Sequence, residues 1–157
     1  MADMLVPLLK LPPYLDLIDE MREQGVIIRR VHPFELTPVR AFVEKHFSVQ
    51  WADEISVGFA SKPTTVYIAI RDGRVVGFGA YECTRRCYFG PTGVEPAERG
   101  KGIGKALLLA CLWGLREMGY AYGIIGAAGP TEFYEKTVGA VSIPDSSPGI
   151  YADLLKR

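Results

Sequence analysis

The sequence predicts an α+β domain in which a mixed β-sheet is flanked by helices. Its first half contains an antiparallel hairpin, because two strand-like runs are joined at Asp72-Gly73, the strongest short-range turn signal in the chain. Its second half has the order strand, helix, strand, which is typical of a crossover within a sheet. The 157 residues are 48% hydrophobic, which suits one substantial core.

Helices are predicted where helix formers follow capping or turn residues. A short helix over residues 15–23 ends at Gly25, and Thr37-Pro38 is a good start for a helix that runs to Phe47. Further helices are predicted over residues 51–59, 104–118 and 130–138. We expect residues 1–24 to form an N-terminal extension that carries the short helix, and residues 25–157 to form a single domain.

Strands are predicted at runs rich in β-branched and aromatic residues between turn signals. These runs cover residues 26–31, 64–70, 74–83, 87–94, 120–127 and 140–143. Pro91 lies within one of them and cannot donate a hydrogen bond to a β-ladder. A bulge or an edge position is therefore expected at that point.

Composition and charge exclude several classes of protein. The 18 basic and 18 acidic residues cancel, which argues against a dedicated nucleic-acid binder. No apolar run approaches the ~20 residues of a membrane span, and residues 1–13 lack the features of a signal peptide. We therefore expect a cytoplasmic protein with neither a nucleic-acid nor a membrane partner.

The three cysteines, Cys83, Cys87 and Cys111, are expected to be free thiols. A zinc site would need a fourth ligand and tighter spacing, and the two histidines, His32 and His46, lie far upstream. A disulfide across the hairpin between Cys83 and Cys87 is conceivable, but a reducing compartment would keep it open. No metal site is expected.

A glycine-rich segment, residues 99–105, has the features of a phosphate-binding loop. Gly100, Gly102 and Gly104 alternate at the start of a predicted helix, so the backbone there is accessible and free to adopt positive φ. The free N–H groups and the positive dipole end of the helix would face a ligand on the loop, and an anion is the natural occupant. The spacing matches neither the nucleoside-triphosphate loop nor the dinucleotide fingerprint.

Two motifs in this region resemble those of the GCN5-related N-acetyltransferase (GNAT) superfamily. The run Val94-Glu95-Pro96-Ala97-Glu98-Arg99 with the glycine segment that follows resembles the Val-x-Pro-x-x-Arg-Gly-x-Gly-Ile-Gly signature at every fixed position. Phe133-Tyr134-Glu135-Lys136, followed by Gly139-Ala140, resembles the second recurrent motif of the superfamily. The resemblance covers roughly residues 26–145. It implies a GNAT-like, mostly antiparallel sheet whose fourth and fifth strands, residues 87–94 and 120–127, splay apart.

The resemblance also implies that residues 25–157 form an acyl-CoA-dependent N-acetyltransferase domain, with acetyl-CoA in the wedge between the splayed strands. The pantetheine arm would pair with backbone near Val94, and the pyrophosphate would accept N–H groups of the glycine segment. The implied cofactor-binding residues are Val94, Arg99, Gly100, Lys101, Gly102, Ile103, Gly104 and Lys105. A solvated helix start remains an equal alternative for each of the three basic side chains.

Direct attack of an amine on the thioester is the usual chemistry of this superfamily. Tyr134 takes the position of the motif tyrosine whose hydroxyl approaches the coenzyme sulfur, so it is the candidate that protonates the departing thiolate. The sequence does not identify a general base. The acidic residues expected near the wedge are Glu82, Glu95 and Glu132, and each is also compatible with an ordinary surface position. His32 and His46 are expected to be structural.

The acceptor is not specified by the sequence. Residues of the early helices and the tail that bear on it are Trp51, Phe59, Tyr151 and the loop 146–149. Neutral net charge favours a small-molecule amine, while acetylation of a protein amino group stays open. Two other classes also stay open, a non-catalytic acyl-CoA sensor and an interaction domain, and so does a homodimer.

Overall fold

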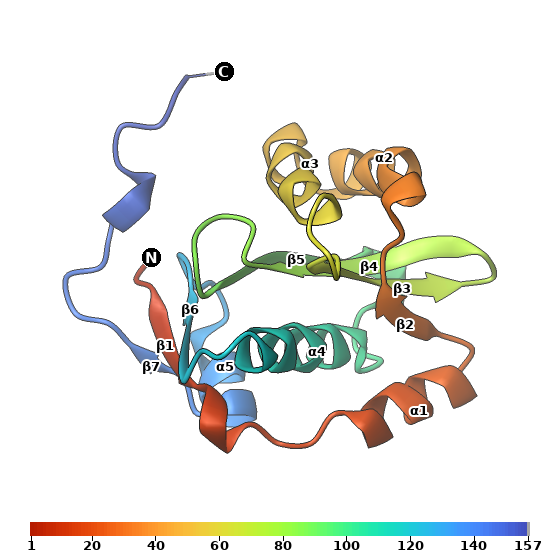
Figure 1. Cartoon of the computed structure of the whole chain (residues 1–157), viewed down its shortest axis with the longest axis horizontal. Helices are drawn as coiled ribbons and strands as arrows, with labels where there is room; N and C mark the ends of the chain where they lie inside the picture. Colours follow the sequence, from red (N-terminus) through yellow and green to blue (C-terminus); the bar gives the residue numbers. More distant parts are fainter. Residues whose placement is uncertain (157) are drawn as a thin grey trace.

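The computed structural model describes residues 1–156, and within them seven strands form one sheet in the order β2-β3-β4-β5-β6-β1-β7 (Figure 1). The strands are β1 (Met4–Pro7), β2 (Ile27–Arg30), β3 (Val66–Arg71), β4 (Arg74–Tyr81), β5 (Tyr88–Val94), β6 (Tyr122–Ile125) and β7 (Val141–Ser142). Neighbouring strands are antiparallel except β5 and β6, which are parallel. The predicted mixed, mostly antiparallel sheet is confirmed.

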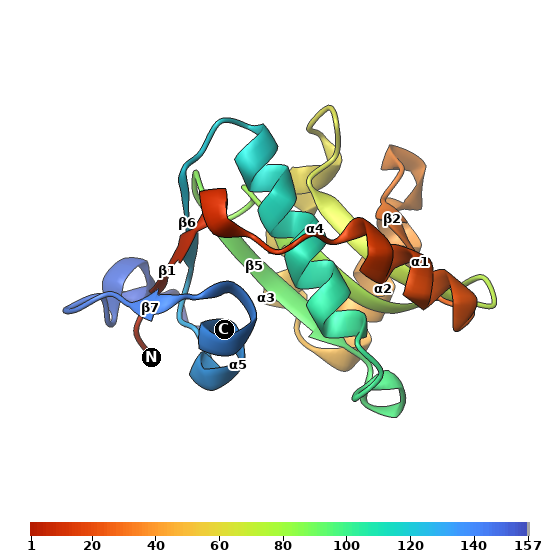
Figure 2. The same cartoon turned by 90° about the horizontal axis from the view of Figure 1, so that it is seen from below.

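Helices cover both faces of the sheet. They are α1 (Leu15–Glu23), α2 (Leu36–His46), α3 (Val49–Ser56), α4 (Ile103–Glu117) and α5 (Thr131–Val138). In Figure 1, α2 and α3 lie on one face, and α1, α4 and α5 lie on the other; Figure 2 shows α4 crossing the sheet diagonally beside α1. Short 3₁₀ turns occupy Leu8–Lys10, Pro33–Glu35, Val57–Phe59, Pro96–Glu98 and Gly149–Tyr151.

Most element boundaries lie close to the expected ones. The helix α1 has the predicted limits, and the helix expected over residues 51–59 is instead the earlier and shorter α3 followed by a 3₁₀ turn. Its start is set by Ser48, whose hydroxyl caps it by accepting from the Trp51 N–H at 3.0 Å. Two strands are shorter than expected. The strand expected over 120–127 is β6, with four residues, and the strand expected over 140–143 is β7, with two.

The N-terminal segment contributes a strand that the sequence analysis did not predict. Strand β1 lies between β6 and β7 and is antiparallel to both, with Met4 opposite Ile125 on one side and Ser142 on the other. Met4 and Val6 are fully buried. The first residues of the chain are therefore part of the same sheet as the later ones (Figures 1 and 2).

Strands β5 and β6 pair over only two positions and then separate. Tyr88 lies opposite Ile124 and Phe89 opposite Ile125, and no further pairs follow within the described residues. The next residues of β5 are Gly90, with φ +116°, and Pro91. The register with β4 shifts between Gly79 and Tyr81, so the bulge expected near Pro91 is present. The predicted splay of the fourth and fifth expected strands is confirmed.

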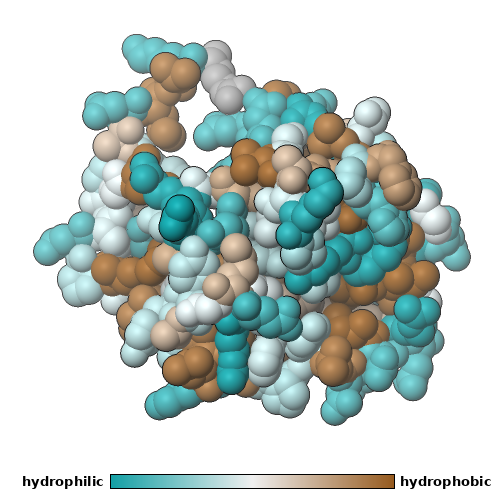
Figure 3. Space-filling model, viewed as in Figure 1, coloured by the Kyte–Doolittle hydropathy of each residue, from teal (hydrophilic) through white to brown (hydrophobic). Residues whose placement is uncertain are grey.

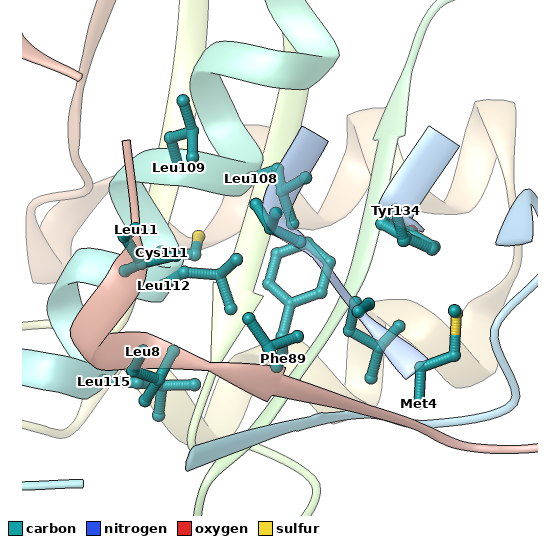
Figure 4. Packing of buried hydrophobic residues seen from close by; sticks show 14 of the residues in the cluster. Met4, Leu8, Leu11, Phe89, Leu108, Leu109, Cys111, Leu112, Leu115 and Tyr134 are labelled. Atoms are coloured by element: carbon teal, nitrogen blue, oxygen red, sulfur yellow. The ribbon is translucent and has the colours of Figure 1, made fainter. Parts of the chain in front are cut away.

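Apolar side chains of α4 pack against the face of the sheet that α1, α4 and α5 cover. The cluster in Figure 4 surrounds Phe89, with Leu108 and Leu112 of α4 on one side and Met4 and Tyr134 on the other. Its members come from both ends of the chain. This packing fixes α5 and β1 against the point where β5 and β6 separate.

Candidate active site

The glycine segment forms the start of α4 and leaves its amides exposed. Gly100 and Gly102 adopt left-handed φ values of +80° and +91°, which a residue with a side chain rarely adopts. Gly102 is the N-cap and offers no side chain to cap the helix. The first helical bond runs from the Ala106 N–H to the Gly102 carbonyl, so the amides of the first turn have no acceptor within the helix. This geometry suits an anion.

The space in front of the first turn is open. A Cβ placed on Gly104 would meet nothing closer than the Val94 side chain at 3.8 Å, and one on Gly100 would meet nothing within 4 Å. Ile103 is buried, so only its amide faces outward. A phosphate group would therefore contact backbone here rather than side chains.

The three basic residues of the segment differ in their contacts. Arg99 Nε donates to the Val94 carbonyl at 3.0 Å, and Lys101 Nζ lies 2.8 Å from Glu98 Oε1. Arg71 also binds Glu98, and the two hydrogen bonds lower the pKa of that carboxyl. Lys105 is exposed and forms no ion pair with the described residues. Lys105 is therefore the freest of the three to meet a phosphate.

The edge of β5 that faces the splay has backbone groups that no strand pairs with, although the Val94 carbonyl accepts from Arg99. The Glu95 N–H donates to the Val76 carbonyl, and the antiparallel register places Gly93 opposite Phe78. Because residues alternate between facing the partner strand and facing away, the backbone groups of Thr92 and Val94 face away from β4, toward the wedge. An extended ligand with amide groups could pair with this edge as an added strand.

A pocket of about 270 Å³ lies at the end of the wedge, and we call it the α5 pocket. It is lined mainly by Trp51, Phe89, Gly90, Pro91, Thr92, Ile125, Gly126, Ala127, Ala128, Gly129, Pro130 and Tyr134. The Tyr134 ring is buried and meets Phe89 edge to face, with ring centroids 6.5 Å apart. Burial raises the pKa of its hydroxyl.

The Tyr134 hydroxyl makes no hydrogen bond with the residues that the structure describes. No buried side-chain polar atom in this part of the chain lacks a partner, so the hydroxyl is not enclosed and reaches the pocket. It is a neutral donor on the lining of the α5 pocket, which lies where β5 and β6 separate. Such a group can protonate or hydrogen-bond an anion formed there.

A second pocket, about 490 Å³, lies on the other side of the same point, and we call it the α3 pocket. Its walls come from α3, from the tip of the β4–β5 hairpin and from the C-terminal segment; the residues are Gln50, Trp51, Glu54, Thr84, Arg85, Ile150, Tyr151 and Leu154. Figure 3 shows the surface hollowed between the C-terminal segment and the helices. The residues that line both pockets are Met1, Trp51, Phe89, Gly90, Pro91, Gly126 and Ala127, so the pockets meet at the splay.

Glu54 is the carboxylate of the α3 pocket. Thr84 Oγ1 donates to its Oε2, while Oε1 has no partner among the described residues. Burial, with the nearby charges of Glu54 and Asp3, raises the pKa of Tyr151 to about 12. Sequence reasoning missed Glu54 and Arg85, since the segments that bring them together are far apart in the chain and no local motif marks either.

The acidic residues considered from sequence do not line either pocket. Glu82 is held by the Tyr120 hydroxyl and the Cys87 N–H, both at 2.8 Å. Glu95 Oε2 lies 3.7 Å from His46 Nε2. Glu132 is exposed at the start of α5. Of the residues considered for the acceptor, Trp51 and Tyr151 line the pockets.

Phe59, also considered for the acceptor, is buried in the core beneath α2 and α3 and has a packing role. Within residues 1–156, no cluster of three or more His, Cys, Asp or Glu is placed to hold a metal ion. None of the helices in that range has the length and apolarity needed to cross a bilayer. Cys83, Cys87 and Cys111 are free cysteines.

Comparison with known proteins identifies related folds. The family profile "Acetyltransferase (GNAT) domain" matches residues 62–137. A search of curated proteins gives no significant match. A GCN5-related N-acetyltransferase structure from Sphaerobacter thermophilus is 20% identical with a TM-score of 0.71, over 90% of this chain and 48% of that one.

Two further structures are similar. One, described as a GCN5-related glucosamine N-acetyltransferase region of a fungal multi-domain β-N-acetylglucosaminidase, is 17% identical with a TM-score of 0.72, over 90% of this chain and 19% of the other. A GNAT family acetyltransferase from Brucella melitensis in complex with acetyl-CoA is 24% identical with a TM-score of 0.56. The match covers 71% of this chain and 80% of that one. This chain thus spans less than half the length of the first two.

The profile match covers several parts of the structure that form the candidate site. The segment matched by the profile contains the glycine segment, both splayed strands and Tyr134. The similar structures share the fold as a whole. Residues 62–137 therefore match the acetyltransferase (GNAT) domain, and the chain shares the fold of GCN5-related N-acetyltransferase structures.

Proposed function

We propose that this chain is an N-acetyltransferase that moves an acetyl group from acetyl-CoA to a primary amine of a small molecule by direct attack. The observation that carries the proposal is the meeting of two pockets at the splay of β5 and β6, one holding the Tyr134 hydroxyl and the other a free carboxylate oxygen of Glu54. Two substrates can reach the same point from opposite sides.

The cofactor side is built from backbone. Pyrophosphate would accept hydrogen bonds from the amides of residues 100–105, with Lys105 adding charge. The pantetheine arm would pair with the open edge of β5 at the Val94 N–H and the Thr92 carbonyl. The open space at Gly104 supports this arrangement, because a side chain there would occupy the position of the ligand. A structural relative is described in complex with acetyl-CoA.

In the reaction, the amine nitrogen bonds to the thioester carbonyl carbon and the carbonyl oxygen becomes an oxyanion. The Thr92 amide, which faces the wedge, is the donor that we assign to that oxyanion. When the C–S bond breaks, sulfur keeps the electron pair and takes a proton from Tyr134. Its raised pKa keeps this phenol protonated at neutral pH.

A small-molecule acceptor fits the size of the α3 pocket. Its volume of about 490 Å³ falls within the range of small-molecule sites, roughly 300 to 1,000 Å³. One similar structure is described as a glucosamine N-acetyltransferase region. The cytoplasmic location and the lack of nucleic-acid and membrane partners stay predictions.

Calorimetric titration with acetyl-CoA and with CoA tests the proposal, with Gly104→Asp as the decisive variant. Gly104 has an ordinary helical conformation and open space, and a carboxylate in the first turn of a helix is stabilising. The variant should therefore fold yet repel the pyrophosphate, weakening binding by about tenfold or more. Gly104→Ala is the control for bulk without charge.

Each outcome separates the candidate functions. Binding to the wild type that is lost in Gly104→Asp, with CoA thiol release in the presence of amines, supports the transferase. Binding without thiol release from any amine indicates an acyl-CoA sensor. Absence of binding by the folded wild type leaves an interaction domain and overturns the proposal.

A further inference from the structure

We propose that the acceptor is an ampholyte of the amino-acid type with an apolar side chain, bound in the α3 pocket with its amine at Glu54 and its carboxylate at Arg85. This inference rests on the proposed function and specifies its substrate. It assigns Glu54 as the base that takes the proton of the amine and Arg85 as the residue that selects for the acid group.

The charged side chains that line the α3 pocket are one carboxylate and one guanidinium, and Met1, whose terminal ammonium donates to Ser147, lines it as well. Glu54 lies on α3, and Arg85 lies at the tip of the β4–β5 hairpin, next to Thr84, which donates to Glu54. Opposite charges on the lining of one pocket match a ligand that carries both an ammonium and a carboxylate. A ligand with an amine alone would leave the arginine without a partner.

Both charged groups have free bonding capacity toward the pocket. Glu54 Oε1 has no partner, while Thr84 fixes Oε2 and with it the orientation of the carboxylate. The Arg85 side chain forms neither a hydrogen bond nor an ion pair with the described residues; only its backbone carbonyl is engaged, by the Tyr88 N–H at 3.2 Å. An acceptor carboxylate can therefore take the guanidinium in a bidentate pair.

Besides the charged residues and the polar Gln50 and Thr84, the walls are apolar and aromatic. Trp51, Phe89, Ile150 and Leu154 line the pocket, and Tyr151 closes it over Gly126. A Cβ on Gly126 would lie 2.5 Å from the Tyr151 hydroxyl, so the absence of a side chain at Gly126 lets the C-terminal segment approach β6. Aromatic surface of this extent suits an apolar side chain on the acceptor.

The proton balance of the reaction is complete with these groups. The acceptor ammonium gives one proton to Glu54 Oε1, and the freed nitrogen pair forms the bond to the carbonyl carbon. On collapse of the tetrahedral intermediate, sulfur leaves with the C–S electron pair and takes the proton of Tyr134. The nitrogen then loses its second proton to the Tyr134 oxygen, which restores the phenol. Glu54 releases to solvent the proton that it took from the ammonium.

The test compares three matched probes with acetyl-CoA in a thiol-release assay: L-phenylalanine, phenethylamine, which lacks the carboxylate, and 3-phenylpropionate, which lacks the amine. L-leucine, L-methionine, L-tyrosine and L-tryptophan extend the set of side chains. We expect turnover of at least one amino acid with kcat/KM about tenfold or more above its decarboxylated amine, and none with 3-phenylpropionate.

Matched variants assign the two charges. Arg85→Gln should raise KM for the amino acid about tenfold and leave phenethylamine unchanged, while the neighbouring Arg86→Gln, outside the pocket, changes neither. Glu54→Gln can keep the hydrogen bond from Thr84 and should lower kcat about 100-fold for every amine. Asp53→Asn, which removes the same charge from the adjacent position of α3, should have little effect.

Two results overturn the acceptor assignment while leaving the proposed function intact. One is equal turnover of phenethylamine and L-phenylalanine with no effect of Arg85→Gln. The other is acetyl-CoA binding with no turnover of any amino acid in the set. Failure of acetyl-CoA to bind would instead overturn the proposed function itself, and calorimetry distinguishes that case.

Discussion

The ring of Phe47 fills the place that a side chain on Gly93 would need, because a Cβ built on Gly93 would lie 2.3 Å from Phe47 Cζ. Phe47 in turn stacks on Trp51, with ring centroids 5.4 Å apart. Trp51 lines both pockets. The glycine in β5 thus sets the position of an aromatic wall of the site.

We predict that Gly93→Ala destabilises the protein by about 1–3 kcal/mol, since the two aromatic rings must shift to admit one methyl group. Urea unfolding followed by circular dichroism measures the loss. Gly129→Ala is the control, because a Cβ there would meet nothing within 4 Å, and it should change stability by less than about 0.5 kcal/mol. Equal stability of the two variants would contradict the packing described.

Tyr134→Phe is expected to reduce kcat about 100-fold and to leave acetyl-CoA affinity unchanged. The hydroxyl is the only atom removed, and it makes no hydrogen bond that holds the fold. Steady-state thiol release and calorimetry on the same preparation separate the two effects. Phe133→Leu, at the half-exposed neighbouring position, is the control. Unchanged kcat in Tyr134→Phe would exclude the hydroxyl as the acid.

The ionisation of Tyr134 also predicts a pH dependence. Burial raises its pKa above the ordinary value of 10, so the protonated form that donates to sulfur persists at neutral pH and is lost only above pH 10. The kcat of the wild type should therefore show no fall between pH 8 and 10 that depends on Tyr134. A decline in that window that is absent from Tyr134→Phe would show a lower pKa and contradict the burial.

Met4→Ala should cost about 2–5 kcal/mol of unfolding free energy. The side chain is fully buried in an interior strand, and its loss leaves a cavity beside Phe89. Leu9→Ala, at a position 64% exposed, is the control and should cost little. If urea midpoints of the two variants agree, β1 does not contribute to the core as the structure indicates.

The Arg29–Glu35 pair predicts a loss of stability in acid. Two hydrogen bonds from Arg29, at 2.9 and 2.7 Å, lower the pKa of Glu35 to about 2 from 4.5. A depressed pKa favours the folded state above the unfolded pKa, so this contribution is present above pH 4.5 and disappears as pH falls toward 2.

Glu35→Gln removes that contribution and serves as the measurement of it. Its urea midpoint should lie below that of the wild type at pH 6, and the difference should shrink as the pH approaches 2. Glu23→Gln, an exposed carboxylate at the end of α1, should show no such convergence. A constant difference across the pH range would exclude the ion pair as its cause.

Local signals account for the parts of the fold that were predicted. The hairpin at Asp72-Gly73 and the helix start at the glycine segment each depend on residues adjacent in sequence, and both are found where expected. The β1 strand has no such signal. Met4–Pro7 is four residues long, and its partners Ile125 and Ser142 are more than 100 positions away in the chain.

The same contrast applies to the candidate site. The cofactor side is carried by two local motifs, so its residues could be named from sequence. The α3 pocket is assembled from α3, a hairpin tip and the C-terminal segment, and Glu54 is fixed by Thr84 thirty residues later. Only the tertiary structure brings these groups to one wall, while Phe59, of the same apolar type as Trp51, turns into the core.

The two sides of the splay between β5 and β6 would recognise their ligands by different groups. On the α5 side, backbone amides and glycines would bind the cofactor, which is the same in every reaction. On the α3 side, side chains from exposed segments would bind the variable partner. Substitutions on the hairpin tip or in the C-terminal segment can therefore redirect the choice of acceptor without disturbing the cofactor, an arrangement that lets new specificities evolve by surface change alone.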